Sequence, residues 1–302
     1  MSDFWSWYII IITLIVLGGC AGLLIWNRNI SPEEAAKKTT GHVFDGIEEK
    51  NMPLPKWWLY LFIITLIFSG IYLALYPGFG KYPGLLGWTQ EGQWQKEVDF
   101  VHKQTQPIFE QYAQVPIEEL WQHQEVMEVG ARLFANNCAT CHGGNASGAR
   151  GYPNLTDEDW LYGGEPENIR TTITNGRRGM MPPMIAAIGN TDEAARDMAL
   201  YVQSLSRPAM RDDPAKLEAI ERAAPRFAVC AACHGADGSG NQMLGAPNLT
   251  DNVWLYGSSL ADIEEGIRKG RSGEMPKFDK LLSPERIHVL SAYVYGLSKQ
   301  KK

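Results

Sequence analysis

Two long apolar segments without a charged side chain stand near the start of the chain, at residues 4–26 and 57–76. As a helix the first would be about 34 Å long, which is enough to span the hydrocarbon core of a bilayer. Tryptophan and tyrosine lie at the ends of the second, as they do in the aromatic belts of membrane helices. A buried core helix is the alternative, but two uncharged segments of this length disfavour it. The pattern predicts two transmembrane helices.

The first apolar segment could also be a leader that is removed from the mature protein. A secretory signal begins with a basic region, and no Lys or Arg precedes this segment. Residues 17–20, Leu-Gly-Gly-Cys, resemble a lipoprotein cleavage site, but the apolar segment continues past Cys20 to Trp26. We therefore expect a membrane span that contains Cys20, and leave lipidation of Cys20 open.

From about residue 120 the pattern changes to segments of helical periodicity separated by loops rich in glycine and proline. These segments form a tandem repeat with a period of about 92 to 94 residues. Residues 153–157, 160–163, 176–182 and 199–205 return, with substitutions, at 247–251, 254–257, 270–276 and 292–297. Each repeat is predicted to contain an opening helix, a cysteine-bearing loop, a short helix, a Met-Pro loop and a closing helix.

Each repeat carries the pattern Cys-x-x-Cys-His, first as Cys138, Cys141 and His142, then as Cys230, Cys233 and His234. This spacing attaches a c-type haem: the two thiols form thioethers with the vinyl groups, and the histidine becomes the proximal iron ligand. Two zinc sites or a disulfide framework are the alternatives. A tetrahedral zinc site would leave both histidines without a role. The motifs therefore predict two covalently bound haem c groups.

Two methionines at equivalent places of the repeats are the predicted sixth iron ligands. Met181 and Met275 each precede a proline and follow their Cys-x-x-Cys-His motif by about forty residues. A thioether favours ferrous iron, and the proline stiffens the loop that presents it. Met180 and Met184 lie near enough to compete in the first repeat. Whether each methionine binds the haem of its own repeat or of the neighbouring one stays open.

With these motifs, each repeat resembles a class I cytochrome c domain, an all-α fold around one haem. Gly130 and Phe134 match the pattern by which the opening helix of that family crosses the closing helix. The second repeat has Arg222 and Arg226 at these places, with Pro225 nearby, so its opening helix is expected to be shorter or shifted.

Polar and aromatic residues that recur near the predicted ligands could donate hydrogen bonds to haem propionates, or could be ordinary surface and core residues. They are Arg177, Arg178, Arg271, Trp160, Tyr162, Trp254, Tyr256, Asn154 and Asn248.

The 302-residue chain carries 28 Lys or Arg and 34 Asp or Glu, for a formal net charge of −6. The charge is mildly acidic and mixed, without the basic stripe that nucleic-acid binding requires. An acidic surface could instead steer a basic cytochrome towards the protein.

The loop between the apolar segments carries a more specific resemblance. Residues 40–49, Thr-Gly-His-Val-Phe-Asp-Gly-Ile-Glu-Glu, and 51–58, Asn-Met-Pro-Leu-Pro-Lys-Trp-Trp, are similar to the N-terminal signature of the CcoP/FixP family. This family is the diheme subunit of cbb-type (C-family) haem–copper cytochrome c oxidases. There the signature precedes a transmembrane helix, a linker and two cytochrome c domains, so the resemblance covers nearly the whole chain.

The resemblance implies an electron-transfer subunit without catalytic residues of its own. Its expected partners are a soluble or membrane-bound cytochrome c donor, the monohaem cytochrome c subunit, and the catalytic subunit with b-type haem and copper. The whole complex would reduce oxygen and pump protons. The nearest alternative is a membrane-anchored diheme shuttle that serves another periplasmic or membrane oxidoreductase. A diheme peroxidase or a docking module with structural haems fits less well, because both repeats carry a matched Met-Pro loop.

Because haem c is attached outside the bacterial cytoplasm, we expect both haem domains in the periplasm and the loop between the spans in the cytoplasm. That loop carries Arg28, Lys37, Lys38, Lys50 and Lys56, as the positive-inside rule requires.

The expected fold is therefore all-α, with two transmembrane helices in the bacterial inner membrane followed by two tandem class I cytochrome c domains. The expected segments are a first transmembrane helix (1–30), a cytoplasmic loop (31–56), a second transmembrane helix (57–77), a periplasmic linker (78–119), cytochrome c domain 1 (120–208) and cytochrome c domain 2 (209–302).

Overall fold

The computed structural model describes residues 1–28, 33, 39–50 and 54–300. The chain divides into two compact units, Met1–Lys103 and Gln104–Lys302. Lys37, Lys38 and residues 51–53 of the signature lie outside the described residues, as do the side chains of Arg28 and Lys50. The chain is mainly helical, as the sequence predicts, with two short antiparallel strand pairs.

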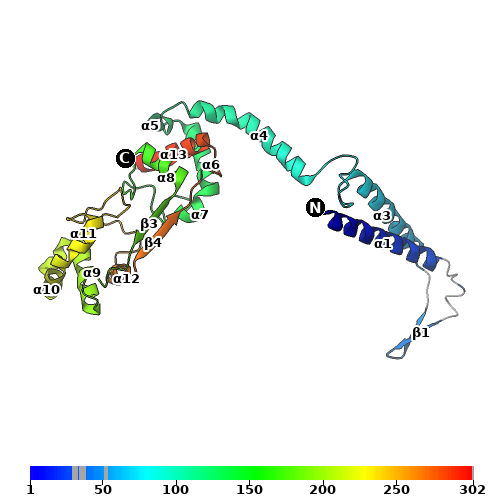
Figure 1. The fold of residues 1–302 in the computed structure, drawn as a ribbon, viewed down its shortest axis with the longest axis horizontal. Helices are drawn as coiled ribbons and strands as arrows, with labels where there is room; N and C mark the ends of the chain where they lie inside the picture. Colours follow the sequence, from blue (N-terminus) through cyan, green and yellow to red (C-terminus); the bar gives the residue numbers. More distant parts are fainter. Residues whose placement is uncertain (29–32, 34–38, 51–53, 301–302) are drawn as a thin grey trace. The chain divides into compact units, whose positions relative to one another are not determined.

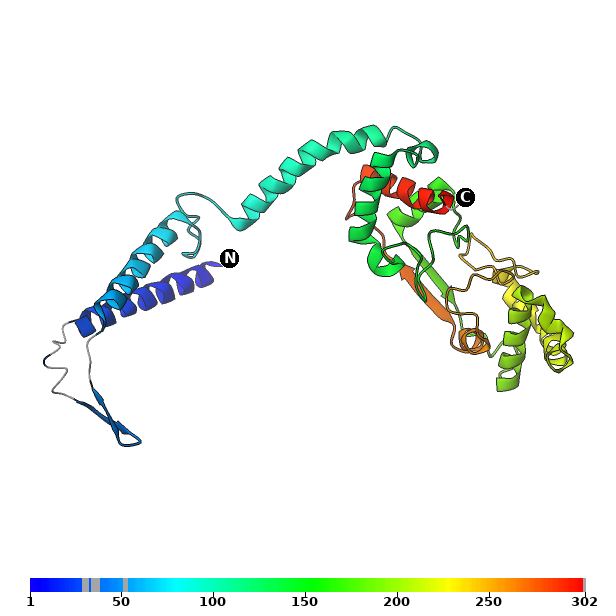
Figure 2. The ribbon, with the colours of Figure 1, turned by 180° about the vertical axis from the view of Figure 1, so that it is seen from behind.

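Two apolar helices form most of the N-terminal unit, α1 (Asp3–Arg28) and α3 (Lys56–Leu75). They lie side by side (Figures 1 and 2), and both are long and apolar enough to cross a membrane. Most of their side chains are exposed, including Trp5, Ile64 and Phe68. Continuous apolar surface of this extent is not found on water-soluble proteins, so lipid is the environment that these helices fit.

The chain after α3 folds back over the ends of both helices. The backbone amides of Leu85 and Leu86 donate to the carbonyls of Ala74 and Leu75, which satisfies acceptors at the end of α3. The amide of Lys81 donates to Ser6 Oγ of α1 at 2.9 Å. This hydrogen bond therefore joins the segment after α3 to α1.

A β-hairpin of β1 (Thr39–Phe44) and β2 (Ile47–Lys50) occupies the loop between the two helices. Asp45 and Gly46 form its turn with φ of 49° and 82°, the left-handed values of a type I′ turn. This hairpin was not expected from the sequence analysis, although Asp-Gly is a strong hairpin signal.

Helix α4 (Gln90–Tyr112) lies within residues 78–119, the expected linker. The C-terminal unit then contains α5 (Ile117–Leu120), α6 (Gln124–Asn137), α7 (Ala139–His142), α8 (Pro166–Asn175), β3 (Arg177–Met181), α9 (Asp192–Ser206), η1 (Pro208–Asp212), α10 (Pro214–Ala223), η2 (Ala224–Phe227), α11 (Ala228–His234), α12 (Leu260–Lys269), β4 (Arg271–Met275) and α13 (Pro284–Lys299).

The first hydrophobic core of this unit joins the opening helix of the first repeat to the closing helix of the second. Phe134 of α6, Ile169 of α8 and Leu290 of α13 are buried together, and Cys138 packs against them. We call this the Cys138 cluster. Helix α6 therefore crosses α13, the last helix of the chain, and not α9, the last helix of its own repeat.

The second hydrophobic core has the complementary composition. Met198 of α9, Phe227 of η2, Cys230 of α11 and Ile267 of α12 are buried together. We call this the Cys230 cluster. The opening helix of the second repeat is short, as expected: α10 ends at Ala223, and the 3₁₀ turn η2 follows, with Pro225 inside it.

An ion pair joins helices α9 and α10. At the equivalent crossing of α6 and α13, the helices meet at Gly130. Arg222 donates two hydrogen bonds to the buried carboxylate of Asp197, at 2.9 and 3.1 Å. Bidentate arginine–carboxylate pairs fix orientation as well as distance. The pair explains why the opening helix of the second repeat can have Arg222 where the first repeat has Gly130.

The predicted Met-Pro loops are extended and pair with each other as an antiparallel ribbon, with Gly179 opposite Gly273 at its centre. The ribbon runs between the two clusters (Figures 1 and 2), so each strand leaves its own short helix and ends beside the short helix of the other repeat. This crossing explains why each cluster contains helices from both repeats.

Candidate haem-binding sites

Both Cys-x-x-Cys-His motifs adopt the same geometry. Each lies on one helical turn, α7 or the end of α11, and each histidine is 8% exposed. His142 Nδ1 lies 3.0 Å from the carbonyl oxygen of Pro153, and His234 Nδ1 lies 3.0 Å from that of Pro247. A carbonyl only accepts, so Nδ1 donates, and Nε2 keeps the lone pair that a metal requires.

An asparagine after each of these prolines holds the carbonyl in place. Asn154 Oδ1 accepts from the amide of Thr156 at 2.9 Å, and Asn248 Oδ1 accepts from the amide of Thr250 at 2.9 Å. The threonine hydroxyls donate to the same oxygens, at 2.8 and 2.7 Å. Asn154 and Asn248 therefore form the turn that orients the histidine rings. The repeat of residues 153–157 at 247–251 is visible in the sequence, but the role of the proline carbonyls is not.

The four motif cysteines are free, and one of each pair is exposed. Burial, with the neighbouring Cys141 as a smaller cause, raises the pKa of Cys138 to about 11, and burial also raises the pKa of Cys230. Reactive dithiols need thiolates, which burial disfavours. Within the described ranges, no three His, Cys, Asp or Glu side chains gather as a metal site.

The predicted methionine ligands lie across the ribbon from their own repeats. Met275 packs against the Cys138 cluster, together with Phe134 and Cys138 itself. Met181 ends β3 opposite Arg271, beside the short helix of the Cys230 cluster. The competing Met180 is 76% exposed and faces away from the cores.

Met184 packs against the Cys230 cluster, but a phenylalanine holds the equivalent place in the other cluster. The amide of Met184 donates to Ile267 O, and the amide of Phe278 donates to Ile173 O. Because Phe278 has no ligand atom, this position serves packing in both clusters. The equivalence leaves Met181 as the counterpart of Met275.

An arginine stands beside each of these methionines and lies over an aromatic ring. The Arg177 guanidinium is 4.7 Å from the Tyr162 ring centre, and that of Arg271 is 4.8 Å from the Tyr256 ring centre. Arg178 is exposed on the other side of the ribbon, opposite Glu274. Of the three arginines singled out from the sequence, the structure therefore brings two to the candidate sites.

One indole group fits a bound carboxylate. Trp254 packs against the Cys230 cluster, and its Nε1 is fully buried with no hydrogen-bond partner among the described residues. A buried donor left unpaired costs about 1–3 kcal/mol, so such groups mark the place of an acceptor. A haem carries two propionates, and the residues of this site therefore fit that group. Trp160, its counterpart, packs against the Cys138 cluster.

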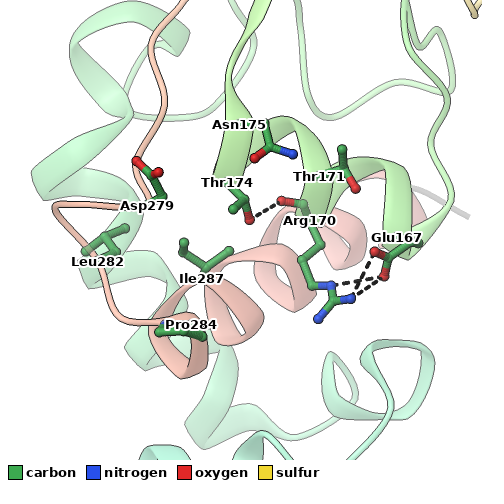
Figure 3. A pocket seen from close by; sticks show the side chains of 9 residues that line it. All are labelled: Glu167, Arg170, Thr171, Thr174, Asn175, Asp279, Leu282, Pro284 and Ile287. Atoms are coloured by element: carbon green, nitrogen blue, oxygen red, sulfur yellow. Dashed lines mark hydrogen bonds and ion pairs between the residues drawn. The ribbon is translucent and has the colours of Figure 1, made fainter.

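A separate surface pocket of about 330 Å³ lies between α8 and the segment that leads into α13 (Figure 3). It is lined by Arg170, Thr174 and Leu282 among others, and by no residue of either Cys-x-x-Cys-His motif. It is not part of the candidate haem sites.

Comparison with known proteins identifies the family. A model described as the N-terminal domain of cytochrome oxidase-cbb3, FixP, matches residues 36–83, and one described as cytochrome c oxidase, cbb3-type, subunit III, matches residues 125–202 and 218–294. The chain belongs to the CcoP/FixP family of cbb3-type cytochrome c oxidase subunits.

Curated relatives in this family match over most of their length. The chain is 46% identical to the cbb3-type cytochrome c oxidase subunit CcoP of Rubrivivax gelatinosus, over 99% of this chain and 97% of the relative. It is 41% identical to the subunit FixP of Azorhizobium caulinodans, over 86% of this chain and 92% of the relative.

Membership confirms the resemblance drawn from residues 40–58. The protein is a membrane-anchored subunit of a cbb3-type oxidase, with tandem cytochrome c domains that bind haem c and serve electron transport. As an oxidase subunit it assembles with other subunits, and its two apolar helices fit the inner membrane.

Proposed function

We propose that the protein binds two haem c groups covalently and passes electrons from a periplasmic cytochrome c towards the oxygen-reducing subunit. The observation that carries this proposal is the duplicated site. Two buried histidines are oriented by the same proline carbonyl contact, and the first cysteine of each motif packs with a methionine-bearing segment. Two sites with the same ligand set suit electron transfer better than catalysis, which needs an open iron position.

The proposed ligand sets are exchanged between the repeats. Cys138 and Cys141 attach the first haem, with His142 and Met275 as axial ligands. Cys230 and Cys233 attach the second, with His234 and Met181. The packing of Met275 with Cys138 supports the first set, and the equivalent position of Met181 on the ribbon supports the second. Cytochrome c domains 120–208 and 209–302 would then be units of sequence that exchange their closing segments.

Haem c supplies a one-electron couple between ferric and ferrous iron. The residues of this chain limit the movement of the ligands when the iron changes its oxidation state. Pro153 and Pro247 hold the histidine rings, and the paired strands hold both methionines at fixed places. Gly176 and Gly270 allow the strands to approach, because a Cβ on either would overlap the carbonyl oxygen of Met275 or Met181. A rigid, buried site needs little rearrangement when the charge on the iron changes.

The haem domains are proposed to lie in the periplasm, with the hairpin of β1 and β2 in the cytoplasm. The donor would be a soluble or membrane-bound cytochrome c, and the acceptors the monohaem subunit and then the catalytic subunit with b-type haem and copper. Oxygen reduction and proton pumping belong to the complex. A phosphatase reporter fused after residue 302 is expected to be active, and one fused in the hairpin turn inactive. The opposite activities would contradict this orientation.

The experiment that tests the function is purification of the complex through a tag on this chain. We expect two haem c per chain, a b-type haem that binds carbon monoxide after reduction, and oxygen uptake with reduced cytochrome c. If the purified material contained c-type bands alone and consumed no oxygen, the protein would instead be a diheme shuttle for another oxidoreductase.

A further inference from the structure

The two candidate sites differ in the charge beside the methionine. Arg177 and Arg271 begin β3 and β4, and the register places Arg177 opposite Met275 and Arg271 opposite Met181. The arginines are therefore equivalent by position, and each stands next to one proposed sixth ligand. Their surroundings decide how much of each positive charge acts on the site.

Arg271 is paired with a carboxylate, and Arg177 is not. Arg271 donates two hydrogen bonds to Glu265 Oε2, both at 3.3 Å, and a third to the carbonyl of Asp262 at 2.8 Å. Arg177 donates from Nε to the hydroxyl of Thr172 at 2.8 Å. In the part of the chain that the structure describes, no carboxylate lies within 4.0 Å of the Arg177 guanidinium.

The sequence of the two short helices explains this difference. Thr171 of α8 stands where α12 has Glu265, so the first site lacks the acid. The acid that α8 does carry, Glu167, pairs with Arg170 of the same helix at 2.9 Å (Figure 3). In the second site the carboxylate is ionised, since hydrogen bonds to Lys269 and Arg271 hold the pKa of Glu265 below its usual range.

The ion pairs around α12 form two groups. Glu265 and Asp262 pair with Arg150, Lys269 and Arg271, and Arg268 pairs with Asp192 and Glu264. Beside α8, Arg170 pairs with Glu167, and Asp279 lines the same pocket as that pair. The Glu265 carboxylate therefore pairs directly with Arg271, whereas the Arg177 guanidinium donates to a neutral hydroxyl.

We propose that Arg177 sets the order of the two midpoint potentials, so that the haem attached to Cys138 is the more easily reduced of the two. This inference rests on the proposed function, since it needs a haem at each site. Reduction adds one electron and removes one positive charge from the iron, so an unpaired cation nearby favours the ferrous form. Beside Arg271, the Glu265 carboxylate offsets that effect. Arg177 is a positioning and tuning residue here, not an iron ligand.

The test is a redox titration of the complete oxidase in detergent, with dithionite as reductant and soluble mediators. A Cys141→Ala background marks the first haem, because a haem held by Cys138 alone keeps one vinyl group and absorbs at longer wavelength. The marked haem should titrate at the higher potential. Arg177→Gln should shift its equilibrium on the order of tenfold towards the oxidised form, about 59 mV for one electron.

Matched variants separate charge from structure. Arg177→Lys keeps the charge, so the marked haem should keep most of its wild-type midpoint potential. Arg178→Gln removes an exposed charge and should shift that potential much less than Arg177→Gln does. Thr171→Glu should lower the midpoint potential of the marked haem, and Glu265→Thr should raise the midpoint potential of the other haem. A marked haem that titrates at the lower potential, or equal shifts from Arg177→Gln and Arg178→Gln, would overturn the inference.

Haem content distinguishes this inference from the proposed function. Pyridine haemochrome analysis should give two haem c per chain in wild type and in every variant. Fewer than two in the wild-type complex would contradict the proposed function and, with it, this inference. Two haems with potentials in the reverse order would contradict the inference alone.

Discussion

Gly130 of α6 lies directly against Tyr293 of α13, so closely that a Cβ on Gly130 would overlap the Cβ of Tyr293. The two residues are 163 positions apart, in different repeats. The Phe134 and Tyr293 rings meet one turn further along, with centroids 5.6 Å apart. This crossing therefore holds the start of the first repeat to the end of the second.

Gly130→Ala is expected to destabilise the C-terminal unit by about 1–3 kcal/mol, because an added methyl group forces two packed helices apart. The measurement is the free energy of unfolding of the haem-loaded protein in denaturant, followed by far-ultraviolet circular dichroism.

Gly144→Ala is the matched control, since a Cβ there meets nothing within 4 Å. A Gly130→Ala protein as stable as the Gly144→Ala protein would show that α6 and α13 are not packed as described.

The unpaired indole of Trp254 gives a second prediction. Trp254→Phe keeps an aromatic ring in the Cys230 cluster and removes the buried Nε1 donor. If Nε1 donates to a haem propionate, its loss should lower the midpoint potential of the second haem, because the propionate charge is then less stabilised. Trp160→Phe should leave that haem unchanged. A potential of the second haem that Trp254→Phe does not alter would contradict the assignment.

The ion pair between Arg150 and Asp262 predicts a dependence on pH. It joins the two repeats at 2.7 Å. Hydrogen bonds from Ser259 and Arg150 lower the pKa of Asp262 from its ordinary value of 3.8. A lowered pKa in the folded state adds stability above the unfolded value, and this is lost as pH falls through the folded value. Asp262→Asn should therefore reduce thermal stability at pH 7.

As pH falls below the ordinary value of 3.8 and through the lower value of the folded state, the difference between Asp262→Asn and wild type should shrink, because wild type loses the same charge. Ser259→Ala, which removes a second partner of Asp262, should weaken the effect at pH 7 as well. A difference in melting temperature that stays constant from pH 7 to pH 3 would show that the ion pair does not stabilise the fold.

Much of the fold could be predicted from the sequence because its signals are local. The apolar segments predicted the ends of α1 and α3 to within one or two residues. The repeat predicted the order of the helices around both Cys-x-x-Cys-His motifs. Pro225 correctly indicated a short opening helix in the second repeat. These features depend on neighbours in the chain, which a sequence displays directly.

The exchange of segments could not be predicted, because two equivalent repeats can pair their helices in either way. Gly130 is compatible with a crossing to α9 or to α13, and the choice depends on how the strands between the clusters pair. The ion pair between Arg222 and Asp197 was missed for the same reason, since it joins residues of different repeats. The hairpin at Asp45-Gly46 has a local signal in its Asp-Gly turn, but no hairpin was predicted there.

The exchanged methionines are the central claim, and one titration tests them most directly. In the Cys141→Ala background, where absorbance marks the first haem, Met275→His should strongly lower the potential of the marked haem, since a His/His site favours ferric iron relative to His/Met. Met181→His should lower only the potential of the unmarked haem. The reverse result, with Met181→His acting on the marked haem, would show that each repeat supplies its own ligand and would contradict the account.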